Sequence, residues 1–436
     1  MSATALDHRP PGIPLGPLVG VAVNVLYLVA WIVARPATGF TPSYISQIVG
    51  VQAIVFFVWS LLVNTVLPGL EWLYGGLDQQ VKWHRYAAIA GFVAIVVHRV
   101  VAPVEAPASQ LSQNLGGLAG IGLVILILWA LMPPSSRAAK WRGPLGWLAR
   151  QPFNKWQLVH RFIGVFLIVA MVHGFLEGTS LVAPLLWWLY MGISTLGVLL
   201  YLYREFVMLK VVPRSEYDVV DVRRPDKRTL VMSLKPVKGR VNAIAGQFAF
   251  IHFDTDGWGL HPFTIASAPD APLLEFGIRV SGDDTQRLYD DLAPGARAIV
   301  SRPHGSFNYA AGAPRQAWVS GGIGITPFVS WLRSLDDQFD RVVDLHVAAR
   351  NEAESPYAAD LRALVAQHPS VTLITYYSDD GEALTAELVA RRLGEARREA
   401  SIYMCGPRPM MKAFESGLSD LGVPRGHITW EDFNVR

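Results

Sequence analysis

Long apolar runs and short polar loops alternate along the first half of the chain. A bilayer core of about 30 Å requires about 20 apolar helical residues for each crossing. Runs that meet this requirement lie at roughly residues 15–34, 45–67, 83–104, 115–132, 158–176 and 183–203. The pattern therefore predicts an all-α membrane domain with six spans over residues 15–210, preceded by an N-terminal tail at residues 1–14.

The pattern changes near residue 212, where charged residues become frequent. Short Val, Ile and Phe runs then alternate with Gly, Pro and Asp turns, as in VVDVRRP, TLVMSLKP and FAFIHF, and such runs are typical of strands. The later runs AWVSGG, RVVDLHVAAR and VTLITYYS alternate with helical stretches, which indicates a parallel sheet. A strand-rich module is therefore expected after the membrane domain.

Basic residues are distributed unevenly over the loops, and this asymmetry predicts an orientation. The loop between the fifth and sixth predicted spans has no Lys or Arg. The loop between the fourth and fifth spans carries Arg137, Lys140, Arg142, Arg150 and Lys155. Since cytoplasmic loops are enriched in Lys and Arg, both termini and the module after residue 210 are expected in the cytoplasm. The first apolar run is too long for a cleavable signal, so we interpret it as a span.

The amino-acid composition excludes several kinds of binding site and partner. Hydrophobic residues make up 51% of the 436 residues and charged residues 17%, against about 25% charged in ordinary soluble proteins. The single cysteine, Cys405, excludes a disulfide framework, a four-cysteine zinc site and a cysteine-ligated iron–sulfur cluster. A net charge of +3 gives no case for nucleic-acid binding.

Histidines recur within two of the predicted spans. The third span, in the stretch VKWHRYAAIAGFVAIVVHRV, contains His84 and His98, and the fifth contains His160 and His173. At 1.5 Å per residue, each pair is separated by about 20 Å along its helix. The two helices run in the same direction, so His84 and His160 are expected at the inner level, and His98 and His173 at the outer. Because neutral imidazole ligates iron without burying a charge, we predict two stacked haems, each held by two histidines.

Other interpretations of these residues remain open. Each histidine alone is compatible with a hydrogen-bonded interfacial residue, whereas the long separation within each helix argues against one shared zinc or proton-relay site. Fourteen residues return to nearly the same helix face but thirteen do not, so we expect either a distorted fifth helix, aided by Gly164, or one that presents its haems from different sides. Neighbours suited either to haem propionates or to an ordinary aromatic belt with snorkelling cations are Trp83, Arg85, Arg99 and Arg161.

Two stretches after residue 210 suit a flavin nucleotide. In HPFTIAS, residues 261–267, a strand backbone is able to lie along a flavin ring, with Thr264 near its reactive nitrogen. In the following IRVSGDDT, Arg279, Gly282 and Thr285 are placed to hold a pyrophosphate through charge and backbone amides. Taken singly, each stretch is also compatible with an ordinary barrel strand and turn.

Two further stretches suit a nicotinamide nucleotide. AWVSGGIGITPF, residues 317–328, is a strand, a glycine-rich turn and a helix start, which lets the backbone approach a pyrophosphate. It departs from G-x-G-x-x-G because Thr326 and Pro327 follow the glycines. In IYMCGPRPMM a strand ends at Cys405, which is either a core residue or a thiol beside the nicotinamide. The chain ends in WEDFNVR, with an aromatic residue at Phe433.

In this order, these motifs resemble the ferredoxin–NADP reductase superfamily. With six spans and four histidines in front, the chain resembles the NADPH oxidase and ferric reductase family, bacterial branch, from about residue 15 onward. The resemblance implies a di-haem membrane domain over residues 15–210, an antiparallel β-barrel FAD domain over 211–312 and an α/β Rossmann-like NADPH domain over 313–436. It further implies a multi-pass protein of the inner membrane of a bacterium, with a cytoplasmic tail at residues 1–14.

The resemblance also assigns roles to single residues. The expected ligands are His84 and His160 for the inner haem b, and His98 and His173 for the outer. The expected flavin residues are His261, Pro262, Phe263 and Thr264, with histidine where soluble reductases have arginine, and Arg279, Gly282 and Thr285 at the pyrophosphate. The expected nucleotide residues are Gly321, Gly322, Gly324, Thr326 and Pro327, with Cys405, Gly406 and Pro407 on the nicotinamide side. Phe433 is expected to cover the flavin ring, and Arg350 to read a 2′-phosphate and so favour NADPH over NADH.

The implied activity is electron transfer from cytoplasmic NADPH through FAD and two haems to an outer acceptor. The short outer loops favour dioxygen, reduced to superoxide, over a ferric chelate. A haem subunit that feeds a periplasmic partner or quinone and a six-span transporter with a nucleotide-sensing domain are the alternatives. The sequence shows no calcium-binding extension and no separate regulatory segment, which suggests constitutive activity, and it leaves the oligomeric state open.

Overall fold

The computed structural model describes residues 15–65, 67, 69–102, 109–133, 140–141, 143–151, 153–177, 183–208, 214–253 and 261–431. The chain divides into two compact units, with the division between residues 211 and 212. We call residues 15–208 the helical unit and residues 214–431 the sheet unit. The predicted N-terminal tail, Arg137, Arg142 and Phe433 lie outside the described residues.

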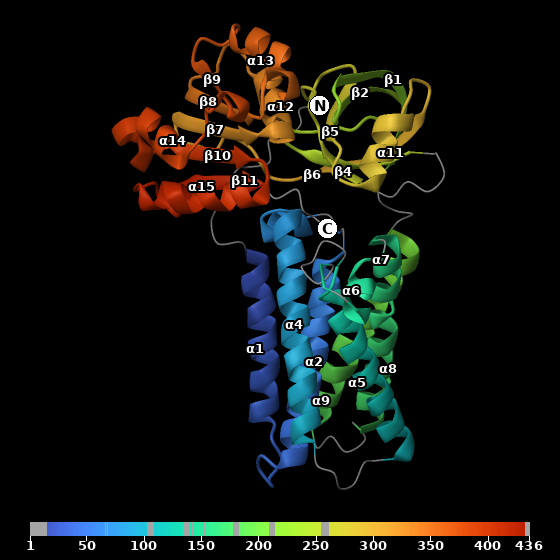
Figure 1. The fold of residues 1–436 in the computed structure, drawn as a ribbon. Coiled ribbons are helices and arrows are strands. Elements are labelled where there is room, and N and C mark those ends of the chain that lie inside the picture. Colours follow the sequence, from blue (N-terminus) through green and yellow to red (C-terminus); the bar gives the residue numbers. More distant parts are fainter. Residues whose placement is uncertain are drawn as a thin grey trace. The chain divides into compact units, whose positions relative to one another are not determined.

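The helical unit consists of helices joined by short connections (Figure 1). Within the described residues, six helical segments are long and apolar enough to cross a membrane. Each of them coincides with one of the predicted runs to within about five residues at either end. The elements are α1 (Leu15–Val33), α2 (Pro42–Val63), α3 (Leu70–Tyr74), α4 (Leu77–Val101), α5 (Gln110–Ala130), α6 (Pro144–Ala149), α7 (Phe153–Arg161), α8 (Ile163–Glu177), α9 (Pro184–Leu202) and the π-helix η3 (Tyr203–Val207).

The fifth span is interrupted next to its first histidine. Helix α7 ends at Arg161 and α8 begins at Ile163, with Phe162 in a turn between them. The bare backbone of Gly164 lies against a ring of α9, since a Cβ there would be 2.1 Å from Tyr201 Cε2. The expected distortion of this helix is therefore present, and it changes the helical phase between the two histidines.

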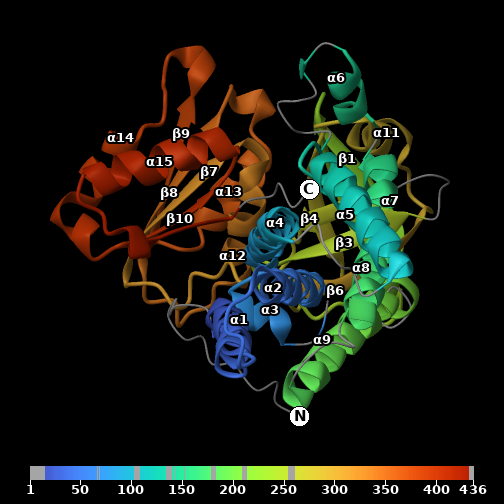
Figure 2. The same cartoon turned by 90° about the horizontal axis from the view of Figure 1, so that it is seen from below.

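Helix α2 forms the centre of the helical unit. It packs against α1, α4, α8 and α9, while α5 packs against α7 and α8, as the end-on view of the helices shows (Figure 2). Val55, Phe57 and Val58 of α2 are buried, whereas outer positions such as Leu26 and Val100 are 68% and 79% exposed. Apolar side chains on the outside of a helical bundle are typical of a surface that faces lipid.

The first sheet of the sheet unit is antiparallel and curled. Its strand order is β4-β3-β6-β1-β2-β5, and an isolated bridge between Ile265 and Phe276 brings its two ends together. The interior is filled by Met232, Ile251 and other apolar side chains. The elements are β1 (Arg214–Asp226), β2 (Thr229–Lys238), β3 (Phe248–Phe253), β4 (His261–Thr264), β5 (Leu274–Arg279), α11 (Asp283–Asp291) and β6 (Arg297–His304).

The second sheet is parallel, as the alternation of strands and helices predicted, with strand order β11-β10-β7-β8-β9. Two apolar clusters, one around Trp331 and one around Met411, fill its faces. The strands are β7 (Arg315–Gly321), β8 (Val342–Ala349), β9 (Val371–Tyr377), β10 (Ser401–Cys405) and β11 (Ile428–Glu431). The helices are η4 (Gly322–Ile325), α12 (Thr326–Ser334), η5 (Glu352–Glu354), α13 (Ala358–Val365), η6 (Ser378–Asp380), α14 (Ala386–Leu393), η7 (Gly394–Arg398), α15 (Arg408–Asp420) and η8 (Arg425–His427).

Helix α12 joins the two sheets. Arg333 donates to Glu275 Oε1 of β5 at 2.8 Å and to the Ala266 carbonyl at 3.1 Å, and Trp331 Nε1 donates to the Ala245 carbonyl at 3.1 Å. A Cβ on Gly246, whose φ is +94°, would lie 2.4 Å from Trp331 Nε1.

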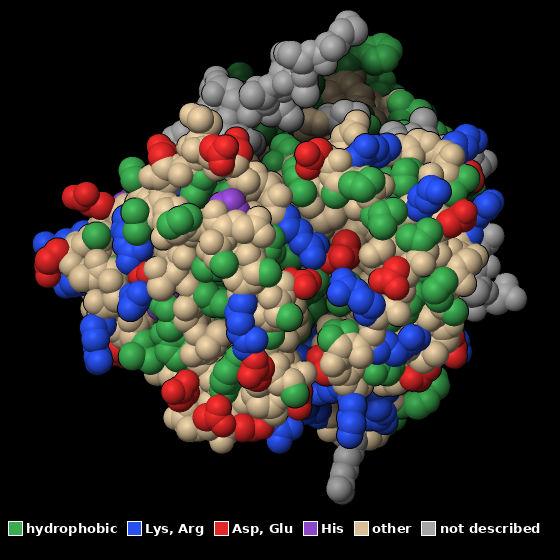
Figure 3. Space-filling model, turned by 90° about the horizontal axis from the view of Figure 1, so that it is seen from above, with side chains coloured by type: hydrophobic (Ala, Val, Ile, Leu, Met, Phe, Trp, Pro, Cys, Tyr) green, Lys and Arg blue, Asp and Glu red, His purple; other side chains and the backbone are tan. Residues whose placement is uncertain are grey.

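The face of the molecule seen from above carries interspersed acidic, basic and apolar side chains (Figure 3), in contrast to the apolar exterior of the helical unit.

His346 in β8 generates a prediction on stability. The residue is fully buried, and burial lowers its pKa from 6.5 to about 4. Below pH 6.5 the unfolded chain binds a proton that the folded chain does not, so stability is complete above pH 6.5. It should fall towards pH 4 by up to about 1.4 kcal/mol per pH unit.

Urea unfolding of the full chain, followed by tryptophan fluorescence at pH 7.5 and 5.5, measures this loss. A His346→Gln variant has no proton to gain at this position, so its free energy of unfolding should fall less between the two pH values. Equal losses in the wild type and the variant would contradict the assignment.

Candidate functional site

The predicted histidine pairs lie ring to ring in the helical unit. The ring centres of His84 and His160 are 6.1 Å apart, and those of His98 and His173 are 6.3 Å apart. We call His84 with His160 the first pair, and His98 with His173 the second pair. Each pair takes one ring from α4 and the other from α7 or α8.

Serine residues orient the rings of three of these histidines. In each case the histidine Nδ1 lies within hydrogen-bond distance of both the carbonyl and the hydroxyl oxygen of one serine. Because a carbonyl oxygen only accepts, Nδ1 carries the hydrogen and Nε2 keeps a free lone pair, the form that binds metals. The partners are Ser60 for His84, Ser46 for His98 and Ser112 for His173, with Nδ1–carbonyl distances of 3.0, 2.8 and 2.9 Å in that order.

These serines were not among the predicted residues, although the sequence contains a signal for two of them. Ser46 and Ser60 are fourteen residues apart in α2, as are His84 and His98 in α4. The two helices pack side by side, so equal spacing places both serines opposite both histidines. Each serine carbonyl therefore accepts a hydrogen bond from a histidine of the neighbouring helix.

His160 is held differently from the other three rings. Its ring stacks on that of Trp156, with centres 5.2 Å apart and planes 6° from parallel. Within the described residues its buried Nδ1 has no hydrogen-bond partner. Stacking, rather than a hydrogen bond, therefore sets the orientation of this ring.

Glycines leave room beside the second pair. A Cβ on Gly50 would lie 2.8 Å from His98 Nδ1, and a Cβ on Gly116 would lie 2.8 Å from His173 Cε1. Real Cβ atoms are not found at such distances from a ring. Both histidine rings therefore pack directly against glycine backbone.

The geometry of the pairs fits two axially ligated haems. Two imidazoles that bind one metal from opposite sides through Nε2, with bonds of about 2.0 Å, hold their ring centres about 6 Å apart. Both pairs have this separation. The described residues contain no group of three or more His, Cys, Asp or Glu side chains suited to a metal ion. A metal held between either pair would therefore have two protein ligands and would need the others from a non-protein group.

The charged residues near the histidines differ between the first and the second pair. Arg161 forms an ion pair with Glu205 in the π-helix η3, and the adjacent Arg204 acts electrostatically on both histidines of the first pair. Of the predicted propionate partners, Arg85 and Arg99 are exposed, which suits contact with solvent or a polar group. Trp83 stacks on Trp59, with ring centres 5.8 Å apart, and so belongs to the aromatic packing of the bundle.

In the sheet unit, the predicted flavin motif forms strand β4. His261 and Thr264 are buried at its two ends, and His261 Nε2 lies 3.6 Å from an Asp284 oxygen in α11. The hydroxyl of Thr285 accepts from the backbone N–H groups of Ser281 and Gly282 at 2.8 and 3.1 Å. Thr285 therefore shapes the turn before α11, and its hydroxyl is already engaged there.

The glycine loop and the cysteine turn lie against each other at the carboxyl ends of β7 and β10. A Cβ on Gly324 would lie 2.2 Å from the Cys405 carbonyl oxygen, and one on Gly321 would lie 2.9 Å from Pro407. Thr326 Oγ1 donates to the Ile323 carbonyl at 2.7 Å, which closes the loop. Nucleotides bind at this edge of parallel sheets, so the structure brings both predicted nucleotide motifs together.

Cys405 is a neutral, buried thiol. It is fully buried, and burial, followed by the nearby Glu431 carboxylate, raises the pKa of its thiol well above the usual value. It is therefore a small, uncharged packing residue next to the predicted nucleotide site and is unsuited to act as a nucleophile. Glu431 lies beside it in β11 and was not among the residues predicted from the sequence.

Arg350 follows β8 and is already paired with carboxylates. It contacts Asp379 Oδ1 at 3.2 Å and Glu354 Oε1 at 3.7 Å. Hydrogen bonds from Asn351 and Arg350 lower the pKa of Asp379. Glu354 also contacts Arg279 Nη2 at 3.4 Å, so one carboxylate bridges the two arginines expected at the flavin and nicotinamide nucleotides.

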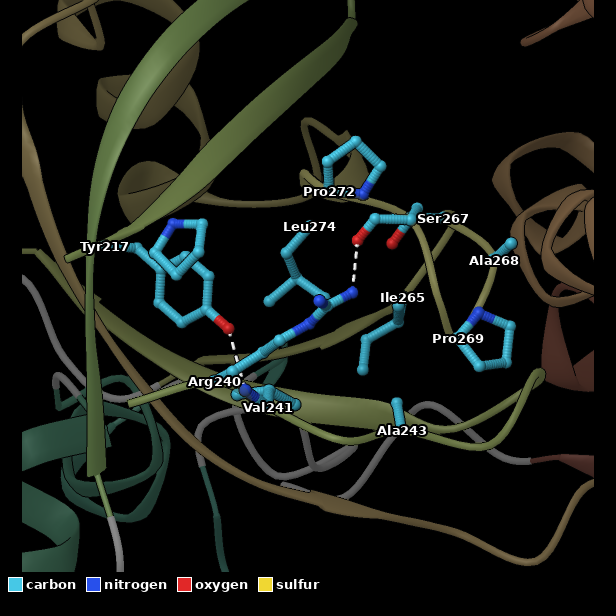
Figure 4. Close-up of a pocket in the computed structure, with 12 residues that line it drawn as sticks. Tyr217, Arg240, Val241, Ala243, Ile265, Ser267, Ala268, Pro269, Pro272 and Leu274 are labelled. Carbon is cyan, nitrogen blue, oxygen red and sulfur yellow. Dashed lines mark hydrogen bonds between the residues drawn. The ribbon is translucent and has the colours of Figure 1, made fainter. Parts of the chain in front are cut away.

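A pocket on the barrel is lined in part by Ile265 and Ser267, from the second half of the predicted flavin stretch HPFTIAS (Figure 4). Arg240 donates to the Ala271 carbonyl at 2.7 Å, and Tyr217 Oη accepts from the Val241 N–H at 2.8 Å. Its lining includes neither strand β4 nor Arg279. The pocket therefore adjoins the predicted flavin stretch without including its strand.

Known proteins are similar to the sheet unit. Residues 215–316 match an FAD-binding domain family and residues 318–416 match an oxidoreductase NAD-binding domain family. A flavohemoprotein of Xylella fastidiosa is 26% identical over 242 residues, which cover 53% of this chain and 59% of that protein. A 3-ketosteroid-9-alpha-monooxygenase ferredoxin reductase component of Rhodococcus rhodochrous is 29% identical over 195 residues, covering 43% and 55%. The chain thus spans between half and two thirds of these relatives.

A solved structure shares the fold. Flavohemoglobin from Malassezia yamatoensis, with bound FAD and heme, has a TM-score of 0.50 at 18% identity, covering 98% of this chain and 100% of that one. Together with the family matches, the geometry shows FAD-binding and NAD-binding domains of the ferredoxin reductase type. The sheet unit therefore consists of the FAD-binding and NAD-binding domains of an oxidoreductase module.

Gly324 generates a prediction on hydride transfer. In Gly324→Ala the new Cβ would meet the Cys405 carbonyl, so the loop or the turn must shift. Flavin reduction by NAD(P)H should slow by about 100-fold, the effect of a misplacement of about 1 Å. Stopped-flow bleaching of flavin absorbance measures the rate.

The matched control is Gly426→Ala, because a Cβ at Gly426 has no atom within 4 Å among the described residues. This control should reduce flavin at the wild-type rate. A wild-type rate in Gly324→Ala as well would contradict the close approach of the loop.

Proposed function

We propose that the protein is a membrane oxidase that carries electrons from cytoplasmic NADPH through FAD and two b-type haems to dioxygen at the outer face, giving superoxide. The observation that carries this proposal is the presence of two histidine pairs on membrane-length helices, with ring centres 6.1 and 6.3 Å apart. A chain with an NAD(P)H–flavin module has a source of electrons, and paired histidines in an apolar bundle give those electrons a path.

The protein's own contribution is to position the cofactors and to exclude water from them. FAD and haem supply the hydride-accepting and one-electron chemistry when bound. Strand β4 presents its backbone to the flavin, Arg279 supplies positive charge, and the loop from Gly321 to Thr326 approaches the nicotinamide nucleotide. Along α4, fourteen residues separate His84 from His98, or about 21 Å, so the two pairs divide a bilayer-sized distance into shorter steps.

The orientation and the acceptor also belong to the proposal. The first pair is taken to lie at the cytoplasmic level and the second at the outer level, in the inner membrane of a bacterium. Of the predicted outer loops, roughly VEAPASQLSQN and SLVAP, residues 104–108 and 180–182 lie outside the described residues, and residues 110–114 belong to α5. Their shortness favours dioxygen, which needs only a small apolar space, over a ferric chelate.

The test compares the two acceptors with the purified full chain. The proposal expects haem absorbance together with NADPH-driven cytochrome c reduction that superoxide dismutase suppresses. Faster reduction of a ferric chelate under anaerobic conditions, with no superoxide in air, would identify a ferric reductase instead. Absence of haem absorbance would overturn both.

Removal of a ligand of the second pair should separate the two halves of the reaction. His98→Ala or His173→Ala should lose one of two haems and all superoxide formation, because the outer site lacks an axial ligand. Reduction of FAD by NADPH should continue at the wild-type rate. Haem content per flavin and stopped-flow flavin reduction measure these quantities.

His368→Ala, a substitution in the sheet unit away from both pairs, is the control and should keep both haems. An unchanged haem spectrum in His98→Ala would refute the assignment of this ligand.

Arg350 and Asp379 should set nucleotide preference in opposite directions. Loss of Arg350 in Arg350→Ala should lower kcat/KM for NADPH by about tenfold and spare NADH, because a charge-assisted bond to the 2′-phosphate disappears. Asp379→Asn should free Arg350 and raise the NADPH to NADH ratio by up to about fivefold, the scale of an exposed ion pair. Kinetics with both nucleotides and an artificial acceptor measure the ratio. An unchanged ratio in both variants would place 2′-phosphate recognition elsewhere.

A further inference from the structure

A carboxylate lies next to the second histidine pair. Within the described part of the six spans, the acidic side chains are Glu177, the last residue of α8, and Glu205 in η3. Glu205 is neutralised by Arg161. Glu177 instead accepts a hydrogen bond from the hydroxyl of Ser112 at 2.5 Å.

Ser112 connects Glu177 to a ligand of the second pair. Ser112 is fully buried in the first turn of α5, where the hydroxyl of Ser109 caps its N–H at 3.1 Å. Its Oγ lies 3.0 Å from His173 Nδ1. Because the Ser112 hydroxyl hydrogen points to Glu177, the oxygen lone pairs face the histidine and accept from its Nδ1–H.

The other two serines lack this connection. The hydroxyls of Ser60 and Ser46 lie 3.2 and 3.5 Å from the carbonyl oxygens of their own histidines. Among the serine-bonded histidines of the described chain, His173 alone is linked through a hydroxyl to a carboxylate. Glu177 also acts electrostatically on His98, the other ring of the pair.

We propose that Glu177, acting through Ser112, is a positioning residue that increases electron donation by His173 and so makes the haem of the second pair more reducing. This inference rests on the proposed function. A ligating imidazole whose N–H is bonded towards a carboxylate becomes a stronger donor, and such outer contacts tune a metal site.

The surroundings of the first pair have the opposite character. His160 has no hydrogen-bond acceptor at Nδ1 within the described residues, and Arg204 places a positive charge near both rings. Positive charge and the missing acceptor favour the reduced state of a bound haem there. The carboxylate therefore acts on the site from which the electron leaves, where a strong reductant is needed for a weak one-electron acceptor.

Redox titration of haem absorbance in the full-length protein tests the inference. In Glu177→Gln, one haem component should shift to a more positive potential, with its reduction equilibrium changed by about tenfold, or about 59 mV for one electron. The component absent from His98→Ala identifies the haem of the second pair. The other component, and FAD reduction by NADPH, should stay at wild-type values.

Ser112→Ala is the second variant, because it keeps the carboxylate and removes only the link. It should shift the same component in the same direction, and it serves as the test if Glu177→Gln does not accumulate. Ser60→Ala, which removes a hydroxyl beside the first pair, should leave the component of the second pair unchanged.

A shift in Glu177→Gln without one in Ser112→Ala, equal shifts of both components, or no shift would overturn the inference. Wild-type protein that binds no haem would overturn the proposed function instead, so the two failures are distinguishable.

Discussion

The helical unit depends on how an imidazole is held in an apolar bundle. A polar N–H without a partner in a hydrocarbon environment costs several kcal/mol, so an acceptor for the histidine Nδ1–H stabilises the bundle, and three of the four paired histidines have one within the described residues. Ser46, Ser60 and Ser112 supply backbone carbonyls for this purpose. The same bond that satisfies Nδ1 leaves the lone pair of Nε2 free. A hydrogen bond at one nitrogen therefore keeps the other nitrogen in the form of imidazole that binds metals.

This constraint also explains the packing of the bundle. Helix α2 carries two of the serines and is the central helix, because its carbonyls must reach both histidines of α4. Glycines at Gly50 and Gly116 let the rings of the second pair lie against backbone. The break at Phe162 rotates α8 relative to α7, which compensates for the thirteen-residue spacing of His160 and His173.

The sheet unit follows a different constraint, the close approach of two backbone turns. Parallel pairing of β7 with β10 puts Ser320 beside Cys405, so the segments that follow both strands meet at one edge. Only a residue without Cβ fits at Gly324, between the loop and the Cys405 carbonyl. The cysteine is buried by this contact, which keeps its thiol neutral next to the nucleotide site.

The sequence alone determined the six apolar helices, the parallel sheet and the pairing of the histidines, because hydrophobic periodicity and the 1.5 Å helical rise depend on local spacing. It did not identify Ser46, Ser60, Ser112 or Glu177, nor the carboxylates that pair with Arg350. Those roles depend on which side chains of distant segments face each other, and helix rotation and strand order decide that. The tertiary structure therefore decided how each histidine is oriented and which charge stands behind it.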